Sequence, residues 1–407
     1  MGAVSTFSWL DHRDDDQKRV RDALAAFDQP GIVDPLGFGV VRDTFSEMLF
    51  PGVSTVQTRA RYFLLVPWVY QRLDRERVAP KDGARRAREW ELELIESLLR
   101  GSDEREGIIG RNSRQRTKQL PSFIYWGGLG RWQVRRFAGT RQEYVGTLRQ
   151  RRQVRRRAGE DVDDPTHVWE PWPGLPAEPE GLYEATSLDL DVDEADFLRG
   201  RALLATKGTY LELLVRDGTT ELDWGDAPWE HPLSATAPAD LVLQLHHARL
   251  FSWATLGASL LYNALLSDLL EEDGYEPLTG DYPDRLEQWV DDIQRMSREI
   301  ANWDRTEFWW LIQRENPRAS GARGFVDYWL DRVTADPQAT VTDPRVARAL
   351  VDRENSIKRA RAKLANRRAR ERSPTSQGGE MMVYRWPQVQ QIIGDIHTGL
   401  EQHAQPS

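Results

Sequence analysis

An apolar segment at residues 49–70 restricts the fold more than any other part of the chain. A Pro51-Gly52 turn precedes Ser54, and Gln57 follows Ser54 at the three-residue spacing of a helix capping box. Apolar side chains then recur at helical spacing as far as Trp68. The segment predicts a buried helix that starts near Ser54, continues to about Arg77 and is kinked at Pro67.

Two arginines in this segment need partners. Arg59 and Arg61 point about 200° apart on a helix, so at least one of them faces the interior. Two interpretations remain open for Gln57, Arg59 and Arg61: an anion site at the helix start, or buried ion pairs, with Asp11 or Asp43 as partners. Arg111 begins a Gly-flanked basic loop that lacks the phosphate-loop pattern. Arg111 can likewise be read either as an anion-binding residue or as a structural one.

Helical periodicity extends over most of the remaining chain, so we expect a mainly α fold of one or two packed helical domains. The spacing predicts a first helix after Asp14, a helix that begins at Asp191 with Glu194 in a capping box, and a basic helix from Pro344 to about Arg372. Strand signals are few, with one short candidate at residues 220–223. Further helices are expected over residues 39–48, 81–100, 240–271, 286–300, 306–313, 325–333 and 387–400.

Charge divides the chain into three segments. Residues 1–158 carry a net charge of +10, residues 159–235 carry −15, and residues 236–407 carry −4. The middle segment is also rich in proline and tryptophan. We therefore expect a basic N-terminal helical domain, an acidic irregular connection with short helices, and a C-terminal helical domain.

Composition and motifs exclude several classes of protein and site. The chain has no Cys, which excludes disulfides, thiolate zinc sites and a cysteine nucleophile. No signal peptide is evident, and no apolar run approaches the ~18 residues of a membrane helix, so we expect a cytoplasmic protein without a membrane partner. No catalytic, cofactor or metal signature is found, and His246-His247 lacks the spacing of a ligand pair. We assign no catalytic residue, cofactor or metal.

Arginine-rich segments carry the sharpest functional signal. Residues 131–157 contain ten Arg and one acid, with Trp132, Phe137 and Tyr144 available to stack on bases. A second basic run covers residues 358–372. The competing interpretations are pairing with the acidic segment of the same chain or of a partner, and plain solvation. The candidate nucleic-acid-binding residues are Arg135, Arg136, Arg149, Arg151, Arg152, Arg155, Arg156, Arg359, Arg367 and Arg368.

Several stretches resemble a bacterial family of unknown function. They are the Trp9-Leu10-Asp11 opening, the 49–70 segment, residues 120–126, and the helix that contains residues 247–252 and 257–263; residues 384–386 look similar too. The resemblance spans nearly the whole chain and implies no assigned activity. It associates the chain with genes found near helicases and nuclease-like proteins in antiviral defence clusters, which is an argument about neighbours only.

Together these features predict a non-catalytic subunit of a bacterial antiphage defence assembly. Such a subunit would bind nucleic-acid backbone without sequence specificity, with DNA favoured over RNA, and would dock a helicase or nuclease. One alternative is a protein–protein scaffold without nucleic-acid contact. A second is an unrecognised metal-dependent hydrolase or nuclease, whose carboxylates the sequence does not assemble.

Overall fold

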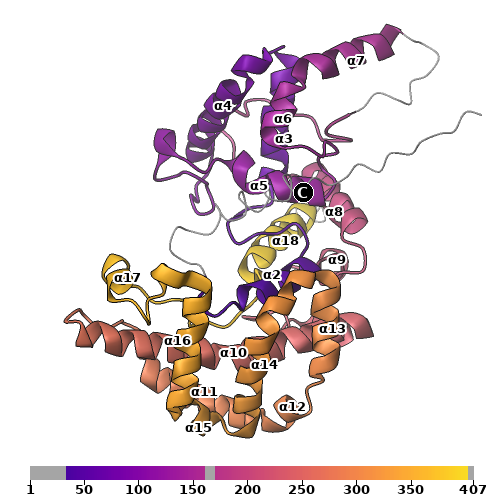
Figure 1. Ribbon diagram of the computed structural model, residues 1–407. Coiled ribbons are helices and arrows are strands. Elements are labelled where there is room, and N and C mark those ends of the chain that lie inside the picture. Colours follow the sequence, from indigo (N-terminus) through magenta and orange to yellow (C-terminus); the bar gives the residue numbers. More distant parts are fainter. Residues whose placement is uncertain (1–33, 161–169, 402–407) are drawn as a thin grey trace, which may run out of the picture. The chain divides into compact units, whose positions relative to one another are not determined.

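A computed structural model describes residues 34–160 and 170–401 of the chain (Figure 1). Helices joined by turns and loops make up this described part, and it contains no strand. The mainly α fold expected from periodicity is therefore confirmed. Residues 220–223, the strand candidate, lie in turns and loop, and the helix expected after Asp14 lies outside the described residues.

The described residues form two compact units, each assembled from separate stretches of chain. The first unit takes residues 34–40, 253–305 and 318–381, and the second takes residues 41–160, 170–252, 306–317 and 382–401. The boundaries at residues 158 and 235, drawn from charge, both fall within the second unit. They mark changes in composition along that unit.

In the second unit, the buried helix α3 (Tyr62–Arg75) is covered by its neighbours in sequence. It lies against α4 (Pro80–Gly101), α5 (Pro121–Arg131) and α7 (Leu148–Glu160), while α6 (Arg141–Gly146) packs on α4 and α7 (Figure 1). An aromatic cluster fills the space between these helices: Tyr144 packs on Trp126 and Trp172, and the Trp172 indole donates to the Tyr144 hydroxyl at 2.8 Å. The unit also contains most of α2 (Gly39–Leu49) and a 3-10 turn, η1 (Arg114–Arg116).

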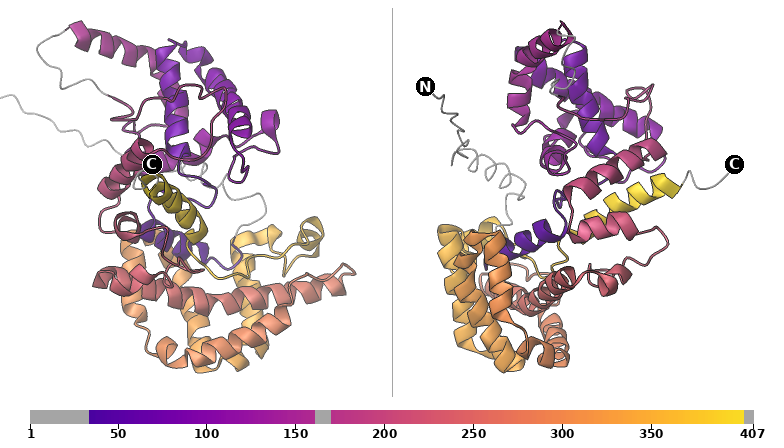
Figure 2. Two further views of the ribbon diagram at one scale, coloured as in Figure 1. Left: turned by 180° about the vertical axis from the view of Figure 1, so that it is seen from behind. Right: turned by 90° about the vertical axis from the view of Figure 1, so that its right-hand side faces the viewer.

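A second group of helices completes this unit. The C-terminal helix α18 (Trp386–Glu401) lies beside α8 (Val192–Ala205) and α9 (Tyr210–Asp217), as Figure 2 shows. Gly399 permits the close approach, because an added Cβ would lie 2.9 Å from the Ala195 methyl. The capping box expected at Asp191 and Glu194 is confirmed at the start of α8. The remaining elements are η3 (Pro232–Thr236) and most of α13 (Arg305–Glu315).

Helices packed through buried tryptophans form the first unit. Trp289 and Trp329 donate their indole N–H groups to the carbonyls of Trp253 and Ala254 at 2.8 and 2.7 Å. These bonds satisfy the polar edge of each ring while its apolar area is buried. The elements are α11 (Tyr282–Arg295), α12 (Ser297–Ala301), η4 (Pro317–Ala319, which begins at the unit boundary), α14 (Ser320–Ala335), α15 (Pro337–Thr342), α16 (Pro344–Lys358), η5 (Arg359–Arg361) and α17 (Arg367–Arg372).

The longest helix, α10 (Ala239–Glu272), contributes residues 239–252 to the second unit and residues 253–272 to the first unit. By length and composition it could cross a membrane, since an 18-residue window has a mean hydropathy of 1.2. The expectation that no apolar run approaches the length of a membrane helix is therefore wrong. However, 67% of that window is buried inside the protein, as in the core helix of a globular protein, so α10 is weak evidence for a membrane.

The predicted helix start at Ser54 is wrong. Residues 54–61 form turns, and α3 begins at Tyr62. Half of the capping box still forms, because the Gln57 side chain accepts from the Ser54 N–H at 3.0 Å, but the same amide donates to the Gly52 carbonyl at 3.2 Å. These bonds stabilise a compact loop in place of a first helical turn.

The long basic helix predicted from Pro344 to about Arg372 is also wrong in its extent. Asp343 does cap α16, accepting from the Arg345 N–H at 2.8 Å, but α16 ends at Lys358. Arg359 has φ = +51°, a left-handed conformation that a helix cannot contain. A 3-10 turn, a short loop and the separate helix α17 follow.

Candidate anion-binding site

Arg59 and Arg61, the arginines of the predicted helix start, both lie in ion pairs within the second unit. Arg59 donates from Nε to both carboxylate oxygens of Asp395 at 2.9 Å, and Asp395 also accepts the Ala60 N–H at 2.8 Å. Arg61 donates to both oxygens of Glu194 at 2.7 and 2.8 Å. Burial raises the pKa of Asp395 and of Glu194, and the paired guanidinium groups oppose that rise.

These pairs connect the loop before α3 to α8 and α18, so the two guanidinium groups are engaged within the protein. Their partners come from much later in the chain than Asp11 and Asp43, the carboxylates considered from the sequence. Asp43 pairs with its neighbour Arg42 at 2.9 Å, and Asp11 lies outside the described residues. Arg111 is exposed, with a 3.4 Å hydrogen bond to the Arg105 carbonyl.

The arginines of α7 do not form one exposed row. Arg151 is buried and pairs with Asp74 of α3 at 3.1 Å, while Arg152 donates to the Leu73 and Val78 carbonyls, both at 2.8 Å. Arg149 is exposed. Arg155 and Arg156 lie in α7, but their side chains fall outside the described part. The α7 segment is thus fastened to α3 through the residues that were expected to face a polyanion.

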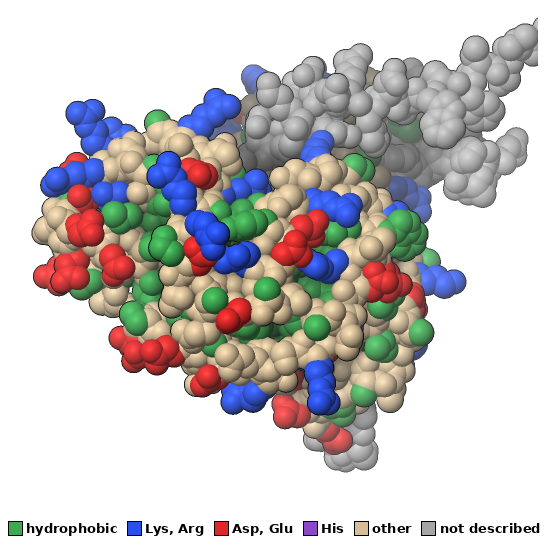
Figure 3. Space-filling model, turned by 60° about the horizontal axis from the view of Figure 1, so that its bottom comes forward, with side chains coloured by type: hydrophobic (Ala, Val, Ile, Leu, Met, Phe, Trp, Pro, Cys, Tyr) green, Lys and Arg blue, Asp and Glu red, His purple; other side chains and the backbone are tan. Residues whose placement is uncertain are grey.

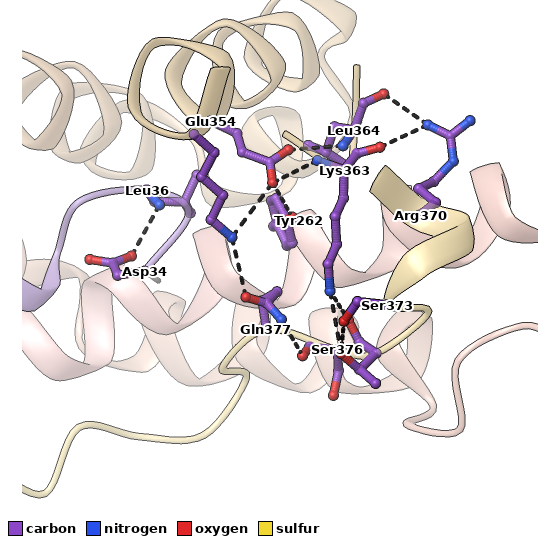
Figure 4. Close-up of polar contacts among 12 residues, drawn as sticks. Asp34, Leu36, Tyr262, Glu354, Lys363, Leu364, Arg370, Ser373, Ser376 and Gln377 are labelled. Carbon is purple, nitrogen blue, oxygen red and sulfur yellow. Dashed lines mark hydrogen bonds and ion pairs between the residues drawn. The ribbon is translucent and has the colours of Figure 1, made fainter. Parts of the chain in front are cut away.

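Some side chains of the second basic run, residues 358–372 of the first unit, are also buried. Figure 4 shows Glu354 accepting the Lys363 and Leu364 N–H groups at 2.9 and 2.8 Å, and the Tyr262 hydroxyl at 2.6 Å. Lys358 and Lys363 are buried, and burial lowers the pKa of Lys363 to about 8. Arg359 and Arg368 are exposed, and Arg367 is exposed beside Asp273 at 3.5 Å and Glu371 at 3.2 Å.

On the face drawn in Figure 3, Lys and Arg side chains lie close to Asp and Glu side chains. Exposed pairs of this kind contribute roughly 0–1 kcal/mol each and leave little net field. A basic binding site instead needs several arginines that line one recess with no carboxylate among the lining residues.

One such place is a recess of about 580 Å³ in the second unit, which we call the arginine recess. No carboxylate is present among the described residues that line it. Arg131 comes from the end of α5, Arg135 and Arg136 from the loop after α5, and Arg201 from α8. The lining residues are Gly127, Gly130, Arg131, Gln133, Arg135, Arg136, Phe137, Ala138, Pro173 and Arg201.

Arg135 is held rigidly at the wall of this recess. Its side chain is 9% exposed, donates to the Trp126 and Gly139 carbonyls at 3.2 and 3.1 Å, and stacks 4.6 Å from the Trp126 ring. Gly130 leaves room for the Arg135 side chain, because a Cβ added at Gly130 would lie 2.6 Å from Arg135 Nη2. Burial lowers the pKa of Arg135 to about 10, with no carboxylate opposing the shift. At neutral pH the group remains a buried cation.

Arg136 and Arg201 add charge that is only partly balanced. Burial lowers the pKa of Arg201, the nearby charge of Arg136 lowers it further, and Glu170 acts in the opposite direction. Arg201 donates to the Pro173 carbonyl, and the Arg136 backbone N–H donates to the Pro171 carbonyl at 2.9 Å. The first contact holds the Arg201 guanidinium and the second holds the Arg136 backbone, and the like charges of the two side chains oppose each other. An anion bound between them would relieve that repulsion.

A carboxylate from another helix positions α5, which forms one wall. Glu91 of α4 is buried and accepts the Ser122 N–H and hydroxyl, both at 2.8 Å. It thereby satisfies an N–H group in the first turn of α5, which has no partner within the helix. Burial raises the pKa of Glu91 to about 7, against hydrogen bonds from Ser122.

A family model described as a family of unknown function (DUF6361) matches residues 4–399. The chain belongs to this family. No curated protein and no solved structure matches the chain. The expected resemblance to a family of unknown function is therefore confirmed across nearly the whole sequence. DUF6361 membership assigns no activity, so function has to be argued from the site.

In this DUF6361 protein, the arginine recess unites two residues of the predicted set, Arg135 and Arg136, with Arg131 and Arg201. Arg131 belongs to the arginine-rich segment but was not singled out. No feature of the sequence pointed to Arg201 as a binding residue, because it lies in the acidic segment, residues 159–235, where only four residues are basic. Only the packing that brings the chain after α5 near α8 places the four together.

Proposed function

We propose that this protein binds the phosphate groups of nucleic acid, without sequence preference, as a non-catalytic subunit of a bacterial antiphage defence assembly. The observation that supports the proposal most directly is the arginine recess, which gathers four guanidinium groups and no lining carboxylate. Guanidinium groups match phosphate oxygens in charge and fork geometry, and they read no base.

Binding to DNA measured against salt tests the proposal. Three phosphate contacts, made by Arg131, Arg136 and Arg201, give a slope of roughly −2.7 in log affinity against log salt, so affinity should fall about 40-fold between 50 and 200 mM. Fluorescence anisotropy with a labelled duplex and a labelled single strand measures this slope. Replacing the three arginines with glutamine should remove most of it.

Arg85→Gln provides a matched control. Arg85 is an exposed arginine of the same unit, paired with Asp82 and Glu89 on α4, and it does not line the recess. Its loss should leave binding unchanged. Absence of salt-dependent binding, or an equal loss in the control and the triple variant, refutes the proposal.

The proposed assembly has its own test. The surface we propose for docking a helicase or nuclease is the acidic segment of residues 170–191, before α8. Co-expression with the proteins encoded by adjacent genes, followed by size-exclusion chromatography, should give a stable complex. A complex that forms equally well without nucleic acid, combined with no binding by the arginine recess, would favour the scaffold alternative.

One observation favours the scaffold as a second candidate. Trp310 on α13 is 60% exposed, with the Arg314 guanidinium 4.7 Å from its ring. Exposed tryptophan and arginine are frequent anchors of protein interfaces. A Trp310→Ala variant that loses a co-purifying partner while keeping DNA binding would assign this surface to docking. The hydrolase alternative has no such support, since the described residues contain no cluster of three His, Asp or Glu side chains suited to a metal.

A further inference from the structure

The arrangement of donors in the arginine recess constrains its ligand. Arg135 uses its Nη groups on two carbonyls and stacks on an indole, so it supplies charge from the wall. The Arg136 side chain forms no ion pair or hydrogen bond among the described residues, and Arg131 pairs with Glu47 at 3.0 Å, where both side chains are about half exposed. Arg131 and Arg136 can therefore turn to a ligand at small cost, because exposed pairs are weak.

The four cations line one recess, and the internally bonded arginines of α7 do not extend that set into a row. A continuous strand would need basic groups repeated along its path, but Arg151 and Arg152 of α7 are directed to Asp74 and to backbone carbonyls. A neighbouring recess of about 380 Å³ shares Arg131 and adds Arg314, but its three carboxylates, Asp43, Glu47 and Glu315, outnumber the arginines. Of these two recesses, the arginine recess is therefore the one with a surplus of positive charge.

A phosphate monoester fits such a recess better than a diester. A monoester carries about −1.5 to −2 charges near pH 7 and presents three terminal oxygens, whereas a diester carries −1. The volume of about 580 Å³ lies within the ~300–1,000 Å³ range of small-molecule sites, large enough for a nucleotide. Phe137, a further lining residue, offers a ring on which the adjoining base can stack.

From this geometry we infer that the arginine recess binds the terminal phosphate monoester of a nucleic-acid strand, so that the protein engages phosphorylated strand ends. The inference rests on the proposed function, because it names which phosphate the recess takes. Arg136, Arg201 and Arg131 donate to the phosphate oxygens, and Arg135 stabilises its charge from behind.

Gly127 allows a test that leaves every arginine in place. It lies on α5 at the recess, and an added Cβ would meet no atom within 4 Å. Gly127→Leu therefore begins from a Cβ in open space and adds its branched side chain at a residue that lines the recess. Gly146→Leu is its matched control, because Gly146 on α6 is equally open but does not line the recess.

The experiment measures the affinity of the full chain for oligonucleotides of one sequence that carry a 5′-phosphate, a 3′-phosphate or only hydroxyl ends. We expect at least one phosphorylated end to bind about tenfold or more tightly than the hydroxyl form. Gly127→Leu and Arg136→Gln/Arg201→Gln should abolish this preference, and Gly146→Leu should retain it. The preference should also weaken below pH ~6, where the monoester gains a proton.

Inorganic phosphate and a nucleoside monophosphate, added as competitors and as ligands in thermal unfolding, separate the two sources of a monoester. If DNA binding depends on salt but its affinity is the same with and without an end phosphate, this inference is refuted and the proposed function stands. Stabilisation by the free monophosphate, blocked by Gly127→Leu, without any DNA binding supports a monoester site but refutes the strand end and the proposed function. No response to any phosphate refutes both.

Discussion

Glu91 makes the stability of the second unit depend on pH in a direction opposite to that of most carboxylates. The carboxyl is 1% exposed, and burial raises its pKa from 4.5 to about 7. The folded protein therefore binds this proton more tightly than the unfolded chain does. The contribution to stability is present in full below pH ~4.5 and is lost as the pH rises to about 7.

The magnitude follows from the two pKa values. Their difference, at ~1.4 kcal/mol per pH unit, amounts to ~3 kcal/mol of unfolding free energy. A Glu91→Gln variant cannot ionise, yet its amide can still accept the Ser122 N–H and donate to the Ser122 hydroxyl. The variant should therefore gain ~3 kcal/mol relative to wild type between pH 4.5 and pH 7.5.

Urea denaturation of both proteins at several pH values, followed by tryptophan fluorescence, measures this difference while other titrating groups cancel. Glu89→Gln is the matched control on the same helix. Glu89 is partly exposed, and hydrogen bonding from Arg85 lowers its pKa, so its trend should be small and of opposite sign. A difference between Glu91→Gln and wild type that stays constant across this range would refute the reasoning.

Two further substitutions test the packing around the loop before α3. Glu194→Gln should cost about 3–5 kcal/mol in urea denaturation, because it leaves the buried Arg61 guanidinium without its carboxylate; a value near 0.5 kcal/mol would contradict the burial of that pair. Gly52→Ala should lower the thermal midpoint by several degrees, since φ is +83° and the new Cβ would lie 2.8 Å from the Trp132 ring. An unchanged midpoint would show that the turn can relax.

Local chemistry made much of the helical fold predictable. The helices α2, α4 and α8 follow from apolar spacing and capping residues that lie within a few positions of one another, such as Asp191 and Glu194. These signals need no information about distant residues. For the same reason, local signals predict the helices themselves better than the tertiary contacts that each helix makes.

The errors arose where distant contacts override local patterns. Ser54 and Gln57 have capping-box spacing, but Tyr125 from α5 accepts the Thr58 N–H at 2.8 Å and Asp395 accepts that of Ala60, which favours a loop. The basic helix ends early because Glu354 accepts backbone N–H groups from the residues beyond it. No local rule identifies such partners.

The candidate site was predictable only in part, for the same reason. Arginine density drew attention to residues 131–157, but density does not show which side chains fold inward. Arg151 is buried because Asp74 lies opposite it on α3, whereas Arg136 remains available for a ligand. Arg201 joins the recess through the packing of α8 alone.

The interleaving of the two compact units along the chain determines how they can be studied apart. Each unit draws on three stretches of sequence, and the chain passes from one unit to the other within α10. A truncation or protease cut between residues 41 and 381 therefore divides both units. Isolating the half that carries the arginine recess will require new covalent links between its separated stretches, such as short engineered linkers, instead of a simple truncation.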